Sequence, residues 1–261
     1  MTNVNNNSNY FVQSVAKGFE VLKAFDARSS TLSLGELAQK TGINKATVRR
    51  FALTLVDLGY LNLMNDNRFQ LSPKVLDLGH HFIESLNLPD LVLPILESMA
   101  TKLKESTNLA VLDGSEVVYV ARVNAAERIV GANLRVGSRL PFYATSLGKA
   151  LVAWIPATYR RQIWENTNIE AFTEKTLVTF EKFEENLSKC RLQGFAYGDG
   201  ELDEGLRSIA MPIFNRKGET IAAMNISTHT LRTTKESIFE TYLPVLKEGA
   251  EKLNRQTAYQ G

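Results

Sequence analysis

The sequence has little of what marks secreted, membrane or cysteine-rich proteins. Cys190 is the only cysteine among 261 residues, which excludes an intramolecular disulfide and a cysteine-based zinc cluster. No apolar run approaches the roughly eighteen residues that a membrane-spanning helix needs. The first ten residues, MTNVNNNSNY, lack the basic and apolar regions of a secretory signal, so residues 1–10 are expected to form a disordered lead. We therefore expect a cytoplasmic protein with no membrane partner.

The motifs of common enzyme classes are also missing. The chain contains no GxGxxG, no P-loop, no HExxH and no GxSxG. His80 and His81 precede Glu84, but no third metal ligand accompanies them, and a solvated helix face is the simpler interpretation. No base or electrophile is visible beside Lys149 in the sequence, and Cys190 fits a small core residue better than a nucleophile. These absences favour a protein that is not an enzyme and that needs no metal or cofactor.

Composition and charge indicate a globular chain with a basic N-terminal part. Hydrophobic residues make up 44% and charged residues 22% of the sequence, which is enough for a buried core. The net charge is +2, but residues 1–76 alone carry 9 Lys/Arg against 5 Asp/Glu. The length allows two domains of ordinary size. We expect the small N-terminal domain to be the basic one.

Two capped helices are expected near the N-terminus, after a first amphipathic helix that carries Val15, Phe19, Leu22 and Phe25 at helical spacing. Ser33 followed by Glu36 has the spacing of a capping box, and Gly42 is a typical helix end. Asn44 then caps KATVRRFALTLVDLG, whose buried stripe is expected to be Val48, Phe51, Leu55 and Leu58. This order of elements predicts a helix-turn-helix.

A β-hairpin is expected directly after these helices. YLNLM and RFQLS alternate in polarity on either side of Asn65-Asp66-Asn67, a turn-forming sequence. Helix, turn, helix and hairpin within 75 residues predict a winged helix-turn-helix over residues 11–73. A helix over 74–88 then serves as a linker, and residues 89–257 form the second domain.

The start of the second helix in such a motif enters the major groove of DNA. Arginine there can bridge guanine, asparagine can pair with adenine, and threonine or lysine can hold phosphate. Because Arg49 and Arg50 point about 100° apart on a helix, one is expected to contact a base and the other a phosphate. The alternative is that these polar and basic residues only form the solvent-exposed face of a surface helix. The predicted DNA contacts are Asn44, Lys45, Ala46, Thr47, Arg49, Arg50 and, on the wing, Arg68.

The second domain alternates helices with strand-like segments, which predicts an α+β domain with helices covering an antiparallel sheet. The expected strands are NLAVLDG, EVVYVARV, RIVGANLRVG, FAYGDGEL, RSIAMPIFN and TIAAMNIST, with turns at Asp113-Gly114 and Asn215–Gly218. Helices are expected over LVLPILESMATKLKEST, from Thr145, twice within 157–192, and at the C-terminus, where Pro244 interrupts the last one.

Several residues of this domain are candidates for a small-molecule site. Ser146 begins a helix whose free N–H groups favour an anion, although the residues alone favour the alternative that Thr145 caps the helix and Gly148 permits close packing. Ser208, Asn225 and Ser227 are polar residues in apolar strands and require partners, either a ligand or a neighbouring strand. In the acidic loop around Asp199 and Glu201, a turn is expected, with one carboxylate supporting the pocket.

These blocks together resemble the IclR family of bacterial regulators. SVAKGFEVLKAF, LSLGELAQKTGINKATVRRFALTLVDLGYL and the hairpin match the family's DNA-binding part, and LPFYATSLGKALVAW, GFAYGDGELDEGLRSIAMPIF and TIAAMNIS match its effector domain. The resemblance covers about residues 11–255. EVVYVARV, EGLRS and AAMNIS are closest to the branch that controls protocatechuate, 4-hydroxybenzoate and β-ketoadipate breakdown.

The resemblance implies a GAF-like effector domain, a homodimer or dimer of dimers on double-stranded operator DNA, a small organic and here aromatic acid as effector, and RNA polymerase as a further partner. The matching effector positions are Ser146, Leu147, Leu206, Ser208, Asn225 and Ser227. Members that bind very small acids tend to have serine where this chain has Asn225. Arg122 is our candidate for pairing with the ligand carboxylate, with a surface salt bridge as the alternative.

Other functions remain open at this point. The chain is either a regulator of aromatic catabolism or a regulator of another small-acid pathway, such as one of glyoxylate or pyruvate. A catalytic effector-like domain with a DNA-binding adaptor and an effector-independent architectural DNA binder are the more distant alternatives.

Overall fold

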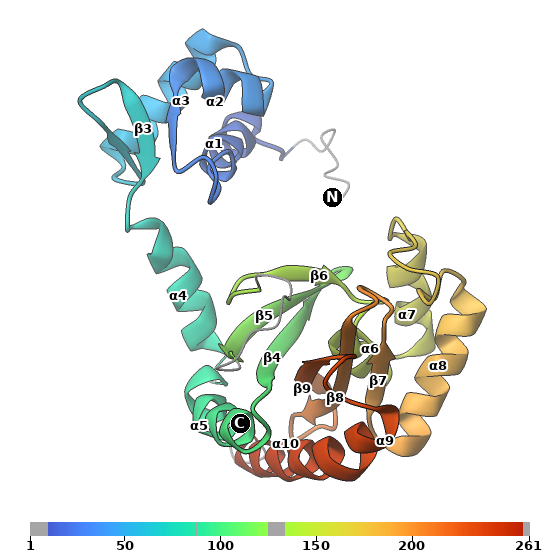
Figure 1. Cartoon of the computed structure of the whole chain (residues 1–261). Coiled ribbons are helices and arrows are strands. Elements are labelled where there is room, and N and C mark those ends of the chain that lie inside the picture. Colours follow the sequence, from blue (N-terminus) through green and yellow to red (C-terminus); the bar gives the residue numbers. More distant parts are fainter. Residues whose placement is uncertain (1–9, 87, 125–133, 258–261) are drawn as a thin grey trace. The chain divides into compact units, whose positions relative to one another are not determined.

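The computed structural model describes residues 10–86, 88–124 and 134–257 (Figure 1). The chain divides into two compact units, one up to Ser85 and one from Leu86 onward. Most of the expected lead over 1–10 lies outside the described residues. Within the described ranges, every helix is too short or too polar to cross a membrane.

The N-terminal unit contains the expected helices and hairpin. The helices are α1 (Gln13–Lys23), α2 (Leu34–Thr41) and α3 (Lys45–Asp57), and the strands are β1 (Thr31–Ser33), β2 (Leu61–Leu63) and β3 (Arg68–Leu71). β1 pairs with β3 and β3 with β2, all antiparallel. The winged helix-turn-helix is therefore confirmed, with one added strand. β1 has only three residues, too few for an alternating pattern to be visible in the sequence.

Side-chain caps define the helix-turn-helix as expected. Ser33 Oγ accepts the Glu36 N–H at 3.3 Å, while a Glu36 carboxylate oxygen accepts the Ser33 N–H at 2.7 Å. Gly42 ends α2 with φ 67°, a conformation that glycine adopts without strain. Asn44 Oδ1 then accepts the Thr47 N–H at 2.9 Å and starts α3. The turn is thus specified by local chemistry.

The expected buried stripe of α3 is confirmed at Val48 and Leu55, whereas Phe51 is only partly buried and Leu58 is exposed. Val21, Leu37, Val48, Ala52 and Leu55 form the core with Leu32, Leu61 and Phe69. Leu58 is 53% exposed because α3 ends at Asp57 and Leu58 lies beyond its last turn. Val15 and Phe19 are also at least half exposed, because Val21 is the one residue of α1 that is fully buried against the core.

The helix expected as a linker over 74–88 is α4 (Val75–Ser85), which has no buried residue. Pro89 does not end it. Pro89 is the first residue of α5 (Pro89–Leu103), where its fixed φ suits a helix start and its missing N–H costs nothing.

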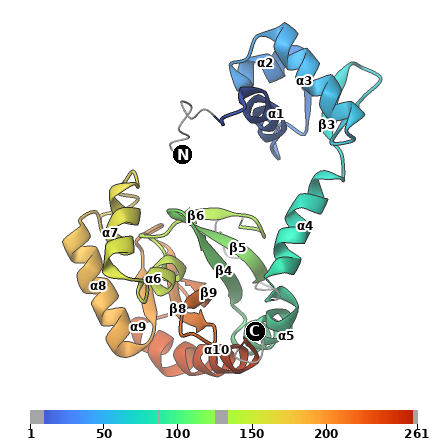
Figure 2. The same cartoon turned by 180° about the vertical axis from the view of Figure 1, so that it is seen from behind.

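The C-terminal unit is built on a six-stranded antiparallel sheet with the order β6-β5-β4-β9-β8-β7 (Figures 1 and 2). Its strands are β4 (Ser106–Asp113), β5 (Glu116–Val123), β6 (Arg139–Pro141), β7 (Ala196–Asp199), β8 (Leu206–Phe214) and β9 (Thr220–His229). Gly114, with φ 60°, lies in the expected β4–β5 turn. The strand expected in RIVGANLRVG falls mostly on residues outside the described ranges, and β6 begins after that segment.

Helices cover both faces of this sheet. α5 and α10 (Leu243–Thr257) pack on one face with Leu109, Ile209, Met224 and Ile226. α6 (Ser146–Val152), α7 (Ala157–Glu165) and α8 (Phe180–Gln193) pack on the other side, with Phe142, Phe183, Ala210 and Ala223 in the core. The α+β prediction is confirmed.

The C-terminal helix is irregular near Pro244, as expected. A short α9 (Lys235–Ser237) leads into a π-helical turn over Ile238–Tyr242, and α10 follows. Proline provides no N–H to the turn before it, and its ring crowds the carbonyl four residues earlier, which favours a wider turn there.

Candidate functional site

The exposed face of α3 is a candidate nucleic-acid interface. Asn44, Lys45, Ala46, Arg49 and Arg50 are exposed, and Thr47 is half-buried, while Val48 on the opposite face is fully buried. Among the described residues, the cations Lys45, Arg49 and Arg50 form no ion pair within 4.0 Å. The α3 start therefore presents positive charge and hydrogen-bond donors without an internal counterion.

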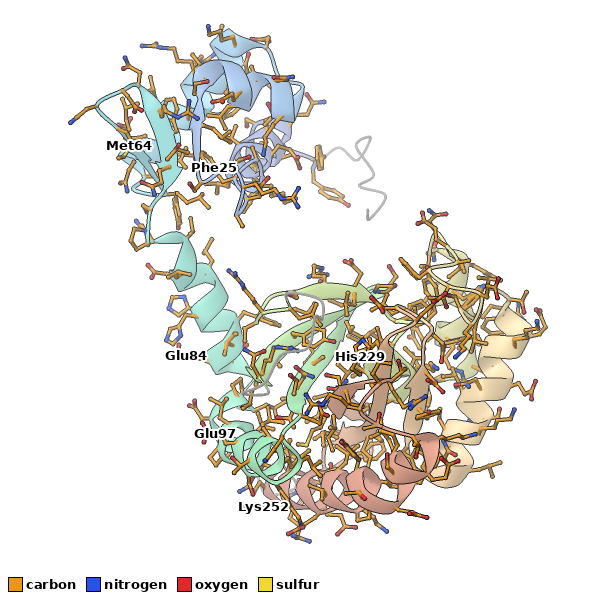
Figure 3. All side chains as sticks on the ribbon, in the orientation of Figure 1. Phe25, Met64, Glu84, Glu97, His229 and Lys252 are labelled. Carbon is orange, nitrogen blue, oxygen red and sulfur yellow. The ribbon has the colours of Figure 1, made fainter. Side chains whose placement is uncertain are left out.

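Arg68 stands apart from that group. It starts β3 of the wing, whose turn lies beside Met64 (Figure 3). Its guanidinium donates to Thr31 at 3.2 Å through the hydroxyl and at 2.8 Å through the carbonyl, and it lies 3.0 Å from a Glu36 carboxylate oxygen. Arg68 thus ties the wing to the capping box at the start of α2, and its contact with DNA stays a prediction.

The C-terminal unit contains a cavity on the α6 side of its sheet. About 410 Å³ of space lies between its lining atoms, open solvent at the mouth included. Five of the seven residues expected around an effector line it: Ser146, Leu206, Ser208, Asn225 and Ser227. The other lining residues are Tyr119, Leu134, Leu140, Ala144, Thr145, Gly198, Glu201 and Leu202.

The strand register brings the polar lining residues together. Ser208 pairs with Ser227 across β8 and β9, and Asn225 lies two residues before Ser227 on the same face. Gly198 on β7 pairs with Ser208, and a Cβ there would lie 3.3 Å from Ser208 Oγ and 3.6 Å from the Ser146 nitrogen. The absence of a side chain at Gly198 keeps this polar corner open.

Two buried oxygens of this cavity have no hydrogen-bond partner among the described residues. They are Ser146 Oγ and Glu201 Oε2. Ser146 is 1% exposed, so bulk water does not satisfy its hydroxyl. A buried polar atom without a partner costs roughly 1–3 kcal/mol. Both atoms are therefore suited to binding a polar ligand.

Glu201 is held in place by a buried cation. Lys149 on α6 is fully buried, forms an ion pair with Glu201 Oε1, and donates to the Tyr197 carbonyl at 3.0 Å. The pair neutralises both charges, which lets a carboxylate lie in an enclosed site. Sequence patterns could not identify this pair, because 52 residues separate the two side chains.

Arg122 and Leu147 do not line the cavity. Leu147 is fully buried in the core beneath α6. Arg122 donates to Asn108 Oδ1 and, at 2.8 Å, to Asn124 Oδ1. Asn108, which the sequence did not single out, lies between Arg122 and the lining residue Asn225.

The start of α6 also shows the helix capping and close packing that were the alternative to an anion site. Thr145 Oγ1 accepts the Gly148 N–H at 3.0 Å, which caps the helix. A Cβ at Gly148 would lie 2.1 Å from the Phe142 carbonyl oxygen, so glycine permits close packing there. Capping and packing thus occur beside an unpartnered Ser146 hydroxyl.

Tyr119 adds a neutral aromatic wall. Burial raises the pKa of its phenol to about 12, with the Arg122 charge acting in the opposite direction. The phenol therefore stays protonated at neutral pH. The described residues contain no group of three or more His, Cys, Asp or Glu side chains arranged to hold a metal ion.

Comparisons with known proteins find a matching family for each of the two units. The family "IclR helix-turn-helix domain" matches residues 14–62, and "Bacterial transcriptional regulator IclR C-terminal" matches residues 80–255. The Pca regulon regulatory protein of Pseudomonas putida is 37% identical over 247 residues, which are 94% of this chain and 84% of that protein.

Two solved structures show the same fold. The IclR protein of Thermotoga maritima matches 95% of this chain and 99% of its own with a TM-score of 0.79 and 26% identity. The inducer-binding domain of the PobR transcription factor from Acinetobacter, a double mutant in complex with 3-hydroxybenzoic acid, is 29% identical with a TM-score of 0.61, over 64% of this chain and 97% of that one. With both family regions matched in order along the chain, this protein belongs to the IclR family of bacterial transcriptional regulators, which bind DNA and are not enzymes.

Proposed function

We propose that this protein controls genes for the breakdown of an aromatic acid, and that the acid binds in the cavity beside α6. The observation that carries this proposal is the pair of buried, unpartnered oxygens in the cavity, Ser146 Oγ and Glu201 Oε2. A hydroxylated acid supplies an acceptor for the serine hydroxyl and a hydroxyl donor for the carboxylate. Binding then recovers two hydrogen bonds that the protein lacks among its own described groups.

The remaining lining supports an aromatic ring. Tyr119, Leu134, Leu140 and Leu202 are large apolar or aromatic side chains around the polar corner. An apolar lining with a few placed polar groups is typical of small-molecule sites. Two relatives support the same class of ligand, because one is a Pca regulon regulator and the other holds 3-hydroxybenzoic acid.

DNA contact is proposed at the start of α3. Asn44, Lys45, Ala46, Thr47, Arg49 and Arg50 would meet base edges and phosphates of operator DNA, and Arg68 would position the wing against the backbone. We further propose a homodimer or dimer of dimers, because two recognition helices then match half-sites about 34 Å apart. In this proposal residues 11–73 bind DNA, residues 74–88 link the domains, and residues 89–257 bind the effector and oligomerise. The regulator acts in the cytoplasm, where RNA polymerase meets the promoter.

Isothermal titration of the full chain with a panel of acids tests the ligand class. The panel contains protocatechuate, 4-hydroxybenzoate, 3-hydroxybenzoate, pyruvate and glyoxylate. We expect a hydroxybenzoate to bind at least tenfold more tightly than either keto acid, and Ser146→Ala to weaken that binding. Ser188→Ala is the matched control, because Ser188 Oγ donates to the Glu184 carbonyl within α8 and lies outside the cavity lining. Tighter binding of pyruvate or glyoxylate would replace the aromatic proposal with a small-acid one.

A further inference from the structure

Three side chains form a hydrogen-bonded row behind the cavity. Arg122, Asn108 and Asn225 are direct cross-strand neighbours on β5, β4 and β9. Arg122 Nη1 donates to Asn108 Oδ1. Asn108 Nδ2 donates to Asn225 Oδ1 at 2.6 Å and to Ser227 Oγ at 3.4 Å. Asn108 is fully buried, while Asn225 and Ser227 line the cavity.

The chemistry of arginine gives this row a direction. A guanidinium only donates hydrogen bonds, so the Asn108 atom that faces Arg122 is the carboxamide oxygen. The Asn108 nitrogen therefore faces β9, and its two hydrogens serve Asn225 Oδ1 and Ser227 Oγ. Because the Asn225 oxygen is already an acceptor in this row, its Nδ2 group is the part left to donate into the cavity. The Ser227 hydroxyl, accepting from Asn108, likewise has its own hydrogen left to donate.

We propose that Asn108 is a positioning residue that orients Asn225 and Ser227 as two adjacent donors for the carboxylate of the ligand. This inference rests on the proposed function. Arg122 acts on the ligand through Asn108 rather than by direct contact, and its positive charge behind the donors favours an anion in front of them.

The other charged groups of the site fit this assignment. Glu201 is paired with Lys149, so the cavity lining that the structure describes carries no net negative charge that would repel a carboxylate. Glu201 Oε2 is an acceptor and takes a ligand hydroxyl. The cavity thus has a donor wall on β9 and an acceptor on the loop after β7. The ligand class that satisfies both is a hydroxy acid whose carboxylate lies against β9.

The test replaces Asn108 and compares two probes that differ only in the group facing β9. The probes are 4-hydroxybenzoate, whose carboxylate only accepts, and 4-hydroxybenzamide, whose amide both donates and accepts. Asn108→Leu keeps the approximate volume of the side chain but leaves Asn225 able to turn its oxygen toward the cavity. In the molecules where Asn225 turns its oxygen toward the cavity, the ligand carboxylate loses the Asn225 N–H donor. The ligand amide can pair with either orientation of the Asn225 side chain.

We expect N108L to weaken 4-hydroxybenzoate binding about tenfold or more and 4-hydroxybenzamide binding less than about threefold, since a charge-assisted hydrogen bond is lost only for the acid. Thr107→Val is the matched control. Thr107 is equally buried on the same strand, but its Oγ1 donates to the Leu96 carbonyl of α5 at 2.9 Å on the opposite face. T107V should leave the affinity ratio of the two probes unchanged. Equal weakening of both probes by N108L would overturn the positioning role.

A second variant covers the case in which N108L does not fold. Asn108→Asp keeps a partner for Arg122 and can only accept from Asn225, which turns the Asn225 oxygen into the cavity. The affinity ratio of acid to amide should then fall further than in N108L. An unchanged ratio in a folded N108D protein would contradict the inference.

The proposed function and this inference fail in different ways. If the wild-type chain binds neither probe nor any acid of the panel, the proposed ligand class is wrong. The row itself is then tested without ligand through the asparagine side-chain amide resonances of ¹⁵N-labelled protein. Arg122→Met should shift the signals of both Asn108 and Asn225, and T107V should shift neither. Loss of Arg122 without any change at Asn225 would overturn the inference.

Discussion

Replacement of Lys149 by methionine tests the buried ion pair on which the cavity depends. Lys149 is fully buried, and the Glu201 side chain is 11% exposed. Methionine fills a similar volume, so the change removes the cation without opening a large cavity. Glu201 then keeps a buried charge with neither oxygen paired, because its Oε2 already has no partner among the described residues.

The expected loss of unfolding free energy is about 3 kcal/mol, the lower end of the range for breaking a buried pair, since Glu201 retains slight exposure. The double variant K149M/E201Q should recover more than half of that loss, because no buried charge remains. Urea unfolding followed by tryptophan fluorescence measures this cleanly. Both tryptophans, Trp154 and Trp164, lie in the C-terminal unit, so the signal reports that unit alone.

Two results would refute this reasoning. One is a K149M protein within about 1 kcal/mol of the wild type, far less than the loss expected for an uncompensated buried charge. The other is a double variant that is no more stable than K149M, which would mean that the lysine acts through packing.

Four further predictions follow from individual residues. Gly148→Ala should destabilise the C-terminal unit by roughly 1–3 kcal/mol, because its Cβ would lie 2.1 Å from the Phe142 carbonyl oxygen. Gly79→Ala is the control and should not destabilise the protein, because no atom lies within 4 Å of its Cβ. Equal urea midpoints for the two variants would contradict this prediction. Burial raises the pKa of the Cys190 thiol to about 11, so a thiol reagent at pH 8 should label it only after unfolding, and rapid labelling of the native protein would count against the fold around α8. Burial also raises the pKa of the Tyr119 phenol from its ordinary value of 10.0 to about 12. The unfolded chain therefore loses this proton first, and stability should fall between pH 10 and 12, more in the wild type than in Tyr119→Phe. Arg50→Ala should weaken operator binding by about 1–3 kcal/mol and unequally across sequences if Arg50 contacts a base, while a uniform loss on random DNA would identify a phosphate contact.

Local chemistry explains which parts of the fold were predictable. The capping box of Ser33 and Glu36, the left-handed Gly42 and the Asn44 cap act over three or four residues, so the sequence reveals them directly. The same holds for the hairpin turn at Gly114 and the irregular helix before Pro244.

The cavity was predictable only in part, because its partners come from distant segments. Ser208, Asn225 and Ser227 stood out as polar residues in apolar strands, and all three line the cavity. Asn108 pairs with Asn225 across 117 positions of sequence, and Lys149 with Glu201 across 52. No short-range pattern marks such pairs. The sequence suggested that Arg122 contacts the ligand directly, because it does not show which residues neighbour Arg122 in the sheet. Only the strand register shows that Asn108 lies between Arg122 and the cavity residue Asn225.

The central claim is that an acid in the cavity changes operator binding, and one titration tests it most directly. Fluorescence anisotropy of a labelled operator fragment is measured while protocatechuate or 4-hydroxybenzoate is added to the full chain. We expect operator affinity to change fivefold or more and the change to saturate at the acid concentration that saturates direct binding, because coupling between two sites is reciprocal. An acid that binds tightly while operator affinity and promoter output both stay constant would contradict it.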